Sequence, residues 1–268
     1  MAMGGRNSFV TVGHLAVRCR IDGPAAAPWL VFSNSLMTDL TLWDDQVAAL
    51  GDRFRILRYD QRGHGETDVP ALPGNFDGLA QDLALLFDAF AIDRAIVIGV
   101  SMGAVTALRF AVLYPDRVRG LVFSDGNAAT APGGAAAWDE RIAIAAVGGM
   151  PALVEPTVGR WFTAASLAAD GAALNKVRAM IRRTPFDGFA RAAAALQAFD
   201  FRADLARIAC PALLIAGAAD GVLPVTMQKM ADAIPDARFA VIEAAGHLPN
   251  IEQPAAFNRT LAAFLDEI

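Results

Sequence analysis

The pentapeptide Gly99-Val100-Ser101-Met102-Gly103 stands where a strand-like stretch gives way to a helix-like one. Four apolar residues, 95–98, precede it, and residues 104–114 follow it with helical spacing. A serine between two glycines in this setting is expected on a sharp, strained strand-to-helix turn. A side chain at either glycine would collide with neighbouring backbone. The pattern therefore predicts that Ser101 is a nucleophile presented at the end of a strand.

The same alternation of strand and helix extends along most of the chain. Continuous apolar runs, typical of strands buried on both faces, occur at residues 29–32, 55–59, 95–100, 120–123, 212–216 and 239–242. Segments with helical spacing lie between or after them, at residues 79–90, 104–114, 225–234 and 254–265. This order predicts an α/β fold with a mainly parallel central sheet flanked by helices.

One long segment interrupts the alternation. Residues 128–200 are rich in alanine, contain several helical patterns and show no comparable strand run. We interpret them as a helical cap inserted into a core domain formed by residues 1–127 and 201–268. The 268 residues, 55% of them hydrophobic, suffice for one such domain with an insertion.

A serine hydroxyl needs a base, and the chain offers three histidines, His14, His64 and His247. His247 follows the strand at 239–242 and precedes the last helix, so we expect it at the carboxyl edge of the sheet beside Ser101. His14 is expected in an N-terminal strand or turn, and His64 in a glycine-bearing loop. The sequence predicts His247 as the base and structural roles for the other two.

The imidazole needs a carboxylate that holds its tautomer, and two aspartates qualify. Asp125 and Asp220 both follow strand-like runs and both lie between Ser101 and His247 in the chain. The acid usually comes from the strand just before the one that leads to the histidine, which favours Asp220. Asp125 stays the alternative.

Two backbone N–H groups are expected to stabilise the negative charge that develops on a substrate oxygen. Met102 begins the helix after Ser101, where N–H groups have no partner within the helix. The second donor is expected in the loop after the strand at 29–32, which reads Ser33-Asn34-Ser35-Leu36-Met37-Thr38-Asp39. We predict the N–H of Leu36 for this role.

Composition and motifs exclude several other classes of protein. The net charge of −5 is spread without blocks, so no basic stripe predicts a nucleic-acid partner. The spacing of Cys, His and Asp predicts no metal site, and no glycine-rich nucleotide loop follows a strand. Cys19 and Cys210 suggest no disulfide framework. The chemistry is therefore expected to be cofactor-free, with a small molecule as the substrate.

The sequence also bears on location. Residues 1–7 lack the pattern of an export signal. Mean hydropathy is +0.38, but no apolar run reaches the roughly 18 residues of a spanning helix, so no membrane is expected. We expect a soluble, cytoplasmic protein. A homo-oligomer stays open.

Several motifs besides the pentapeptide resemble the 3-oxoadipate enol-lactonases of the α/β-hydrolase superfamily. The resemblance is carried by Ser33-Asn-Ser-Leu-Met-Thr-Asp-Leu, Leu57-Arg-Tyr-Asp-Gln-Arg-Gly-His-Gly, Arg160-Trp-Phe-Thr and His247-Leu-Pro-Asn-Ile-Glu-Gln-Pro. It implies cofactor-free opening of a five-membered enol-lactone to 3-oxoadipate. Met37 and Ala104 stand where the family more often has glycine.

The enol-lactone implied by this resemblance carries a carboxylate, which calls for a cation in the site. The cap offers Arg141 and Arg160, close in sequence to Trp138 and Trp161, which could wall a pocket. A solvated cap surface is the alternative for these residues. A broad carboxylesterase, a perhydrolase with the same triad, and a binding receptor on this fold are the alternative functions.

Overall fold

The computed structural model describes residues 7–71 and 74–268. Its centre is an eight-stranded sheet in the order β1-β2-β4-β3-β5-β6-β7-β8. The strands are β1 (Asn7–Val12), β2 (Leu15–Asp22), β3 (Trp29–Ser33), β4 (Arg55–Tyr59), β5 (Ala95–Val100), β6 (Val118–Ser124), β7 (Ala212–Gly217) and β8 (Ala237–Ile242). Strands β1 and β2 pair antiparallel, as do β2 and β4, and the other neighbours are parallel. The predicted mainly parallel sheet is confirmed.

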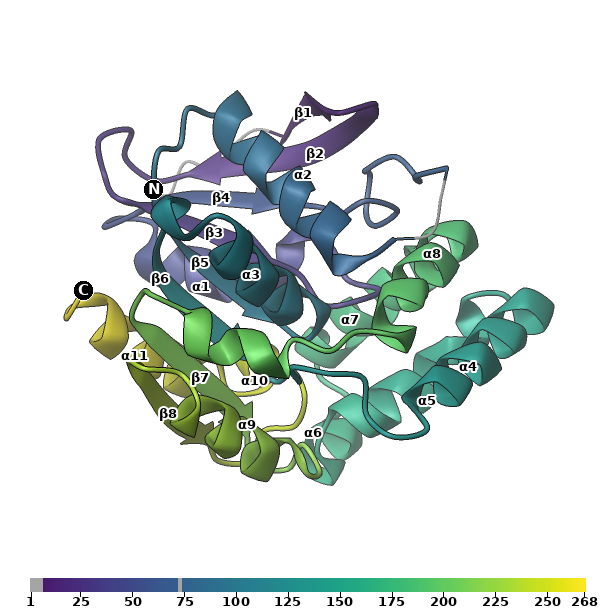
Figure 1. The fold of residues 1–268 in the computed structure, drawn as a ribbon. Coiled ribbons are helices and arrows are strands. Elements are labelled where there is room, and N and C mark those ends of the chain that lie inside the picture. The colour runs from purple at the N-terminus through teal and green to yellow at the C-terminus, as the bar shows by residue number, and fades with distance from the viewer. Residues whose placement is uncertain (1–6, 72–73) are drawn as a thin grey trace.

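Helices cover the sheet and form a separate group beside it. The helices before β6 and after β7 are α1 (Asp44–Leu50), α2 (Phe76–Ala89), α3 (Met102–Leu113), α9 (Leu223–Asp232), α10 (Pro249–Glu252) and α11 (Pro254–Leu265). Between β6 and β7 come α4 (Gly134–Gly148), α5 (Pro151–Trp161), α6 (Ala164–Ala169), α7 (Ala172–Arg183) and α8 (Phe186–Gln197). Helices α2 and α3 pack side by side over the sheet, whereas α4 to α8 gather on the side away from the C-terminus (Figure 1).

Strand burial explains the continuous apolar runs of the sequence. Every residue of β5 and of β7 is buried, because helices and neighbouring strands enclose both faces. The register places Ser33 beside Gly99 and Val100 beside Ser124. The carboxyl ends of these parallel strands therefore meet along one edge, and the loops that follow them can share a site.

The helical insertion leaves the sheet through a narrow neck. Ala129 and Asp200 form an isolated antiparallel bridge, and the N–H of Phe201 donates to the carbonyl of Ala128 at 2.7 Å. These contacts bring the two ends of the insertion together directly after β6 and before β7. They support our proposal that residues 128–200 form the cap and that 1–127 with 201–268 form the core domain.

The structure also bears on the predictions about disulfides and membrane-spanning helices. Cys19 and Cys210 are both free and buried. Within the described ranges, no helix combines the length and the apolarity that a bilayer crossing requires. Residues 1–6, on which most of the expectation about an export signal rests, lie outside the described part.

Candidate active site

Ser101 occupies the sharp turn between β5 and α3. Its φ of 56° and ψ of −121° lie outside the regions that most side-chain-bearing residues adopt. Its N–H donates to the carbonyl of Ser124 at 2.8 Å, which fixes the turn to the end of β6. Strain of this kind persists where surrounding contacts over-determine the backbone, and it is common at functional sites.

The two glycines that flank Ser101 are required by close backbone contacts. A Cβ built on Gly99 would lie 2.2 Å from the carbonyl oxygen of Gly103. A Cβ on Gly103 would lie 2.2 Å from the carbonyl oxygen of Ser33 and 2.6 Å from that of Asn34. The predicted collision with neighbouring backbone is confirmed at both positions. The contact at Gly103 also places the loop after β3 directly against the first turn of α3.

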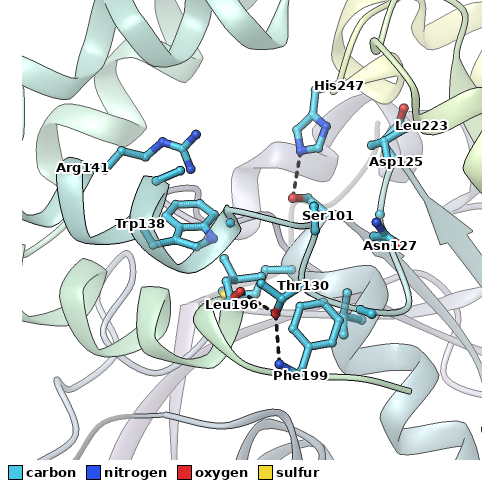
Figure 2. A pocket seen from close by; sticks show the side chains of 17 residues that line it. Ser101, Asp125, Asn127, Thr130, Trp138, Arg141, Leu196, Phe199, Leu223 and His247 are labelled. Atoms are coloured by element: carbon cyan, nitrogen blue, oxygen red, sulfur yellow. Dashed lines mark hydrogen bonds between the residues drawn. The ribbon is translucent and has the colours of Figure 1, made fainter. Parts of the chain in front are cut away.

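His247 reaches Ser101 from the loop after β8. Its Nε2 lies 2.9 Å from Ser101 Oγ (Figure 2). The backbone N–H of His247 donates to the carbonyl of Trp161 at 2.7 Å, and the two rings stack with centroids 5.6 Å apart. Gly246 donates its N–H to Glu252 Oε2 at 2.7 Å. Contacts from the cap and from α10 therefore hold the imidazole at the serine.

Asp220 is the aspartate that contacts the imidazole. Its Oδ2 lies 2.7 Å from His247 Nδ1, the ring nitrogen that faces away from Ser101. The turn after β7 presents it, closed by a hydrogen bond from the N–H of Asp220 to the carbonyl of Gly217 at 3.0 Å. A carboxylate in this place accepts a hydrogen bond from Nδ1–H, which keeps the proton on Nδ1 and leaves Nε2 free to accept one from Ser101.

Asp125, the alternative acid, is fully buried behind this group. Its Oδ1 accepts from the N–H of Gly217 at 2.8 Å, and its Oδ2 accepts from Ser124 Oγ at 2.6 Å. Burial, followed by the negative charge of Asp220, raises the pKa of the Asp125 carboxyl well above its ordinary value. Within residues 7–71 and 74–268, the His247 ring forms its hydrogen bonds with Asp220 and Ser101 and none with Asp125.

The other two histidines lie apart from Ser101. His14 is in the turn between β1 and β2. His64 is 1% exposed in the loop after β4, where its Nδ1 lies 3.1 Å from the carbonyl oxygen of Arg62. Burial lowers the pKa of His64 to about 4, so the ring is neutral in the folded protein at neutral pH.

The loop that was expected to supply a second oxyanion donor is rigidly held. Asn34 donates to the carbonyl of Tyr59 at 2.7 Å and accepts from Trp43 Nε1 at 2.9 Å. Leu36 follows in this loop and is 1% exposed, as is Met102 at the start of α3. Met37 has a φ of 60°, a conformation that favours glycine, which is the residue more often found there in the enol-lactonases that the sequence resembles.

A cavity of about 290 Å³ opens over Ser101 at the junction of core and cap. Trp138 and Arg141 of α4 lie on one side, and Asp125, Asn127 and Leu223 lie on the other (Figure 2). The remaining wall is mostly apolar and is formed by Val105, Ala129, Ala131, Ala137, Leu196 and Phe199, among others. The volume lies near the lower end for small-molecule sites, so the pocket suits a small ligand.

Two of the four predicted cap residues face this cavity. Arg141 lies 4.4 Å over the Trp138 ring, a cation–π geometry that fixes its direction. Trp161 does not line the cavity but stacks on His247. Arg160 also lies outside the lining, and desolvation, followed by the positive charge of Arg141, lowers the pKa of its guanidinium.

Arg141 forms no ion pair with a carboxylate in residues 7–71 and 74–268. Desolvation lowers the pKa of its guanidinium, and the charge of Glu140 offsets this in part. A half-buried guanidinium beside an apolar wall can bind an anionic ligand group through two parallel hydrogen bonds.

The neck of the cap supplies lining residues that the sequence analysis missed. Thr130 Oγ1 accepts from the N–H of Phe199 at 3.0 Å and donates to the carbonyl of Leu196, also at 3.0 Å (Figure 2). These residues carry no motif. Their signal is positional, because they flank the insertion at the strand end next to Ser101.

The sequence pattern of the alpha/beta hydrolase family matches residues 25–260. The chain belongs to this family and is a hydrolase. It is 33% identical to 3-oxoadipate enol-lactonase 2 of Acinetobacter baylyi over 96% of this chain and 95% of that protein. It is also 33% identical to a protein named for carbamate hydrolysis, RutD of Pseudomonas savastanoi, over 90% of this chain and 95% of the relative.

A solved structure extends this similarity to three dimensions. The crystal structure of the enol-lactonase from Burkholderia xenovorans LB400 superposes on this hydrolase with a TM-score of 0.92 at 36% identity. The match covers 97% of this chain and 100% of the other. The family resemblance expected from the motifs is thereby confirmed.

Proposed function

We propose that this hydrolase opens a small lactone that carries a carboxylate, 3-oxoadipate enol-lactone, through an acyl-enzyme and without a cofactor. The observation that carries the proposal is the chain of contacts from Ser101 through His247 to Asp220, at 2.9 and 2.7 Å, beneath a small cavity that Arg141 lines. The sequence similarity to enol-lactonases, which extends along nearly the whole chain, supports the choice of lactone.

The first half of the reaction acylates the serine. His247 Nε2 takes the proton of Ser101 Oγ as that oxygen bonds to the lactone carbonyl carbon. The N–H groups of Met102 and Leu36 hold the carbonyl oxygen, which becomes negative. When the tetrahedral intermediate collapses, the ring C–O bond breaks and His247 returns the proton to the enol oxygen. The enol then rearranges to the ketone.

The second half releases the product. A water molecule gives a proton to His247 and attacks the ester carbonyl carbon, and collapse breaks the bond to Ser101 Oγ, which regains a proton. Asp220 keeps Nδ1 protonated throughout and stabilises the imidazolium that forms twice per turnover. The net change is addition of one water to the lactone, which yields 3-oxoadipate.

Arg141 is the group that we assign to the substrate carboxylate. It is half-buried, lies in the cavity lining and is held over Trp138 at 4.4 Å. The positive charge of Arg141 lowers the pKa of Arg160, so the charges of the two guanidinium groups repel each other. A bound anion relieves such repulsion.

The test compares substrates with and without the carboxylate. In Arg141→Gln, kcat/KM for the enol-lactone should fall by about 10- to 100-fold, because a charge-assisted hydrogen bond contributes about 1.5–3 kcal/mol. Turnover of p-nitrophenyl acetate should stay within about threefold, since that ester lacks the charge. Arg182→Gln, an exposed arginine of α7, is the matched control and should change neither.

A carbamate and a neutral lactone of the same ring size complete the substrate panel, because a relative is named for carbamate hydrolysis. The proposal requires the carboxylate-bearing lactone to have the highest kcat/KM. Preference for the neutral compounds, or an equal loss on both substrate types in Arg141→Gln, would contradict it.

A further inference from the structure

Glu252 of α10 is a half-buried carboxylate that the reaction as written does not use. Its two oxygens accept hydrogen bonds from two distant parts of the chain. Oε2 accepts from the N–H of Gly246 at 2.7 Å, and Oε1 accepts from the N–H of Thr163 at 2.9 Å and from the Thr163 hydroxyl. Gly246 directly precedes His247, whereas Thr163 lies between α5 and α6 of the helical insertion. One carboxylate therefore joins the insertion to the loop of the histidine.

A second hydrogen bond joins the same two segments. The N–H of His247 donates to the carbonyl of Trp161 at 2.7 Å, and the rings of these two residues stack. Two successive backbone N–H groups are thus held from the same side of the loop, that of Gly246 by Glu252 and that of His247 by Trp161. These contacts fix the backbone from which the imidazole projects.

Gly246 is also packed tightly on both sides. A Cβ built on Gly246 would lie 2.3 Å from the carbonyl oxygen of Trp161, and a Cβ on Gly217 would lie 2.0 Å from the carbonyl oxygen of Gly246. The loop is therefore enclosed between the end of β7 and the end of α5 at backbone contact distance. A shift of residues 161–163 must displace Gly246, and with it His247.

The chemistry of the contacts suits a carboxylate. The Thr163 hydroxyl oxygen accepts from the N–H of Ser166 at 3.3 Å, so its proton can point to Glu252. All the groups around the Glu252 carboxylate are then donors, and a carboxylate offers only acceptors. A glutamine amide has one oxygen, so its NH₂ group would face a backbone N–H, that of Gly246 or that of Thr163, in either orientation.

We propose that Glu252 is a positioning residue: by binding Gly246 and Thr163 together, it holds His247 Nε2 at the 2.9 Å contact with Ser101 Oγ. It acts through the histidine and touches no reacting atom. The proposal rests on the proposed role of His247 as the base. It gives the helical insertion a second task, because the segment that follows α5 supports the base while α4 walls the cavity.

The kinetic test is Glu252→Gln on p-nitrophenyl acetate. We expect kcat to fall by about 10- to 100-fold, because a displacement of about 1 Å at a catalytic group can cost that much. KM should stay within about threefold, since Glu252 does not line the cavity and both halves of the reaction use the same base. Glu243→Gln makes the same chemical change at an exposed residue after β8 and should alter neither quantity.

A pair of substitutions at Thr163 tests the other end of the contact without a change of charge. Thr163→Val removes the hydroxyl donor and should lower kcat by about three- to tenfold with KM unchanged. Thr163→Ser keeps the hydroxyl and should keep kcat within about twofold.

The kinetic results can overturn the proposal in two ways. Wild-type kcat in Glu252→Gln would mean that the carboxylate does not position the base, and Thr163→Val decides in the same way if Glu252→Gln does not fold. A rise in KM without a fall in kcat would mean that Glu252 shapes the cavity instead.

NMR of the histidine ring protons tests the position of the imidazole without a substrate. His247→Ala identifies the signal of His247 among the three histidines. This signal depends on the stacking against Trp161, where the ring centroids lie 5.6 Å apart. In Glu252→Gln it should move, whereas the signals of His14 and His64 should not. An unmoved His247 signal would overturn the proposal. Absence of ester and lactone turnover in wild type would instead count against the proposed function, because the NMR result does not depend on turnover.

Discussion

At the scale of single residues, the site depends on two glycines, where no side chain would fit, as much as on its polar side chains. Because Gly103 has no side chain, α3 begins in contact with the Ser33 and Asn34 carbonyls. Because Gly99 has none, the turn at Ser101 can bring Gly99 into contact with the Gly103 carbonyl. Ser101 carries the strain that results, at a φ of 56°. The same close approach brings the Leu36 loop to the N-terminus of α3, where we place the two oxyanion donors.

At the scale of elements, α7 and α8 of the proposed cap both contact the core. Gly188 of α8 packs backbone to backbone against Gly63 of the loop after β4, and a Cβ on Gly188 would lie 1.9 Å from the Gly63 carbonyl oxygen. Lys176 of α7 donates to the carbonyl of Thr41 at 2.6 Å. Helix α4, which carries Arg141, packs on α8 and is positioned through it.

This attachment gives a prediction for Gly188→Ala. The added methyl group must push α8 off the core loop, because its nearest contacts are backbone atoms that cannot rotate away. We expect kcat/KM for the enol-lactone to fall at least about tenfold, with a loss of about 1–3 kcal/mol in the free energy of unfolding. Kinetics and urea unfolding measure the two quantities.

Gly159→Ala is the matched control, since Gly159 lies in cap helix α5 with open space where its Cβ would be. It should leave kcat/KM unchanged and stabilise the helix slightly. Equal behaviour of the two variants would contradict the account of the cap.

The elements that the sequence predicted are those whose signal is local. Continuous apolar runs identified β5 and β7, and the glycines around Ser101 identified the turn between β5 and α3. Both signals lie within a few consecutive residues of the sequence. The antiparallel pairing of β2 with β4 is a contact between distant segments and has no local signal. Helices α2, α3 and α9 begin two or three residues before the apolar spacing suggested. Asn75 caps α2 by accepting from the N–H of Gly78, whereas α3 and α9 begin without a side-chain cap.

Some residues of the site were predicted from the sequence, and others were distinguished only by the structure. Ser101 and His247 stood out because one motif and three histidines left few choices. Asp125 and Asp220 both follow strand ends, and only the geometry separates them, with Asp220 at 2.7 Å from His247. In the cap, Arg141 faces the cavity whereas Trp161 stacks on His247. The direction of a side chain on an alanine-rich helix depends on packing that spacing alone does not encode.

At the scale of the whole molecule, buried titratable groups couple stability to pH. The pKa of His64 is about 4 in the folded protein against 6.5 ordinarily, so between these values the unfolded chain binds more protons. Stability therefore falls as the pH falls through this window. Burial raises the pKa of Asp60 to about 6, which acts in the opposite direction over nearly the same range.

Comparison of wild type with His64→Gln isolates the histidine, because Asp60 is present in both. The difference in free energy of unfolding should shrink by about 3 kcal/mol between pH 7 and pH 4. Chemical unfolding at several pH values measures it. A difference that does not vary with pH would show that His64 is not held neutral.

The most direct measurement for the whole account is the turnover of Ser101→Ala on the enol-lactone, together with its unfolding midpoint. Removal of the hydroxyl leaves binding and the oxyanion donors but no acyl-enzyme. The account predicts a fall in kcat of at least about a thousandfold, with the fold and its stability retained. Turnover near that of wild type in a folded Ser101→Ala protein would contradict it.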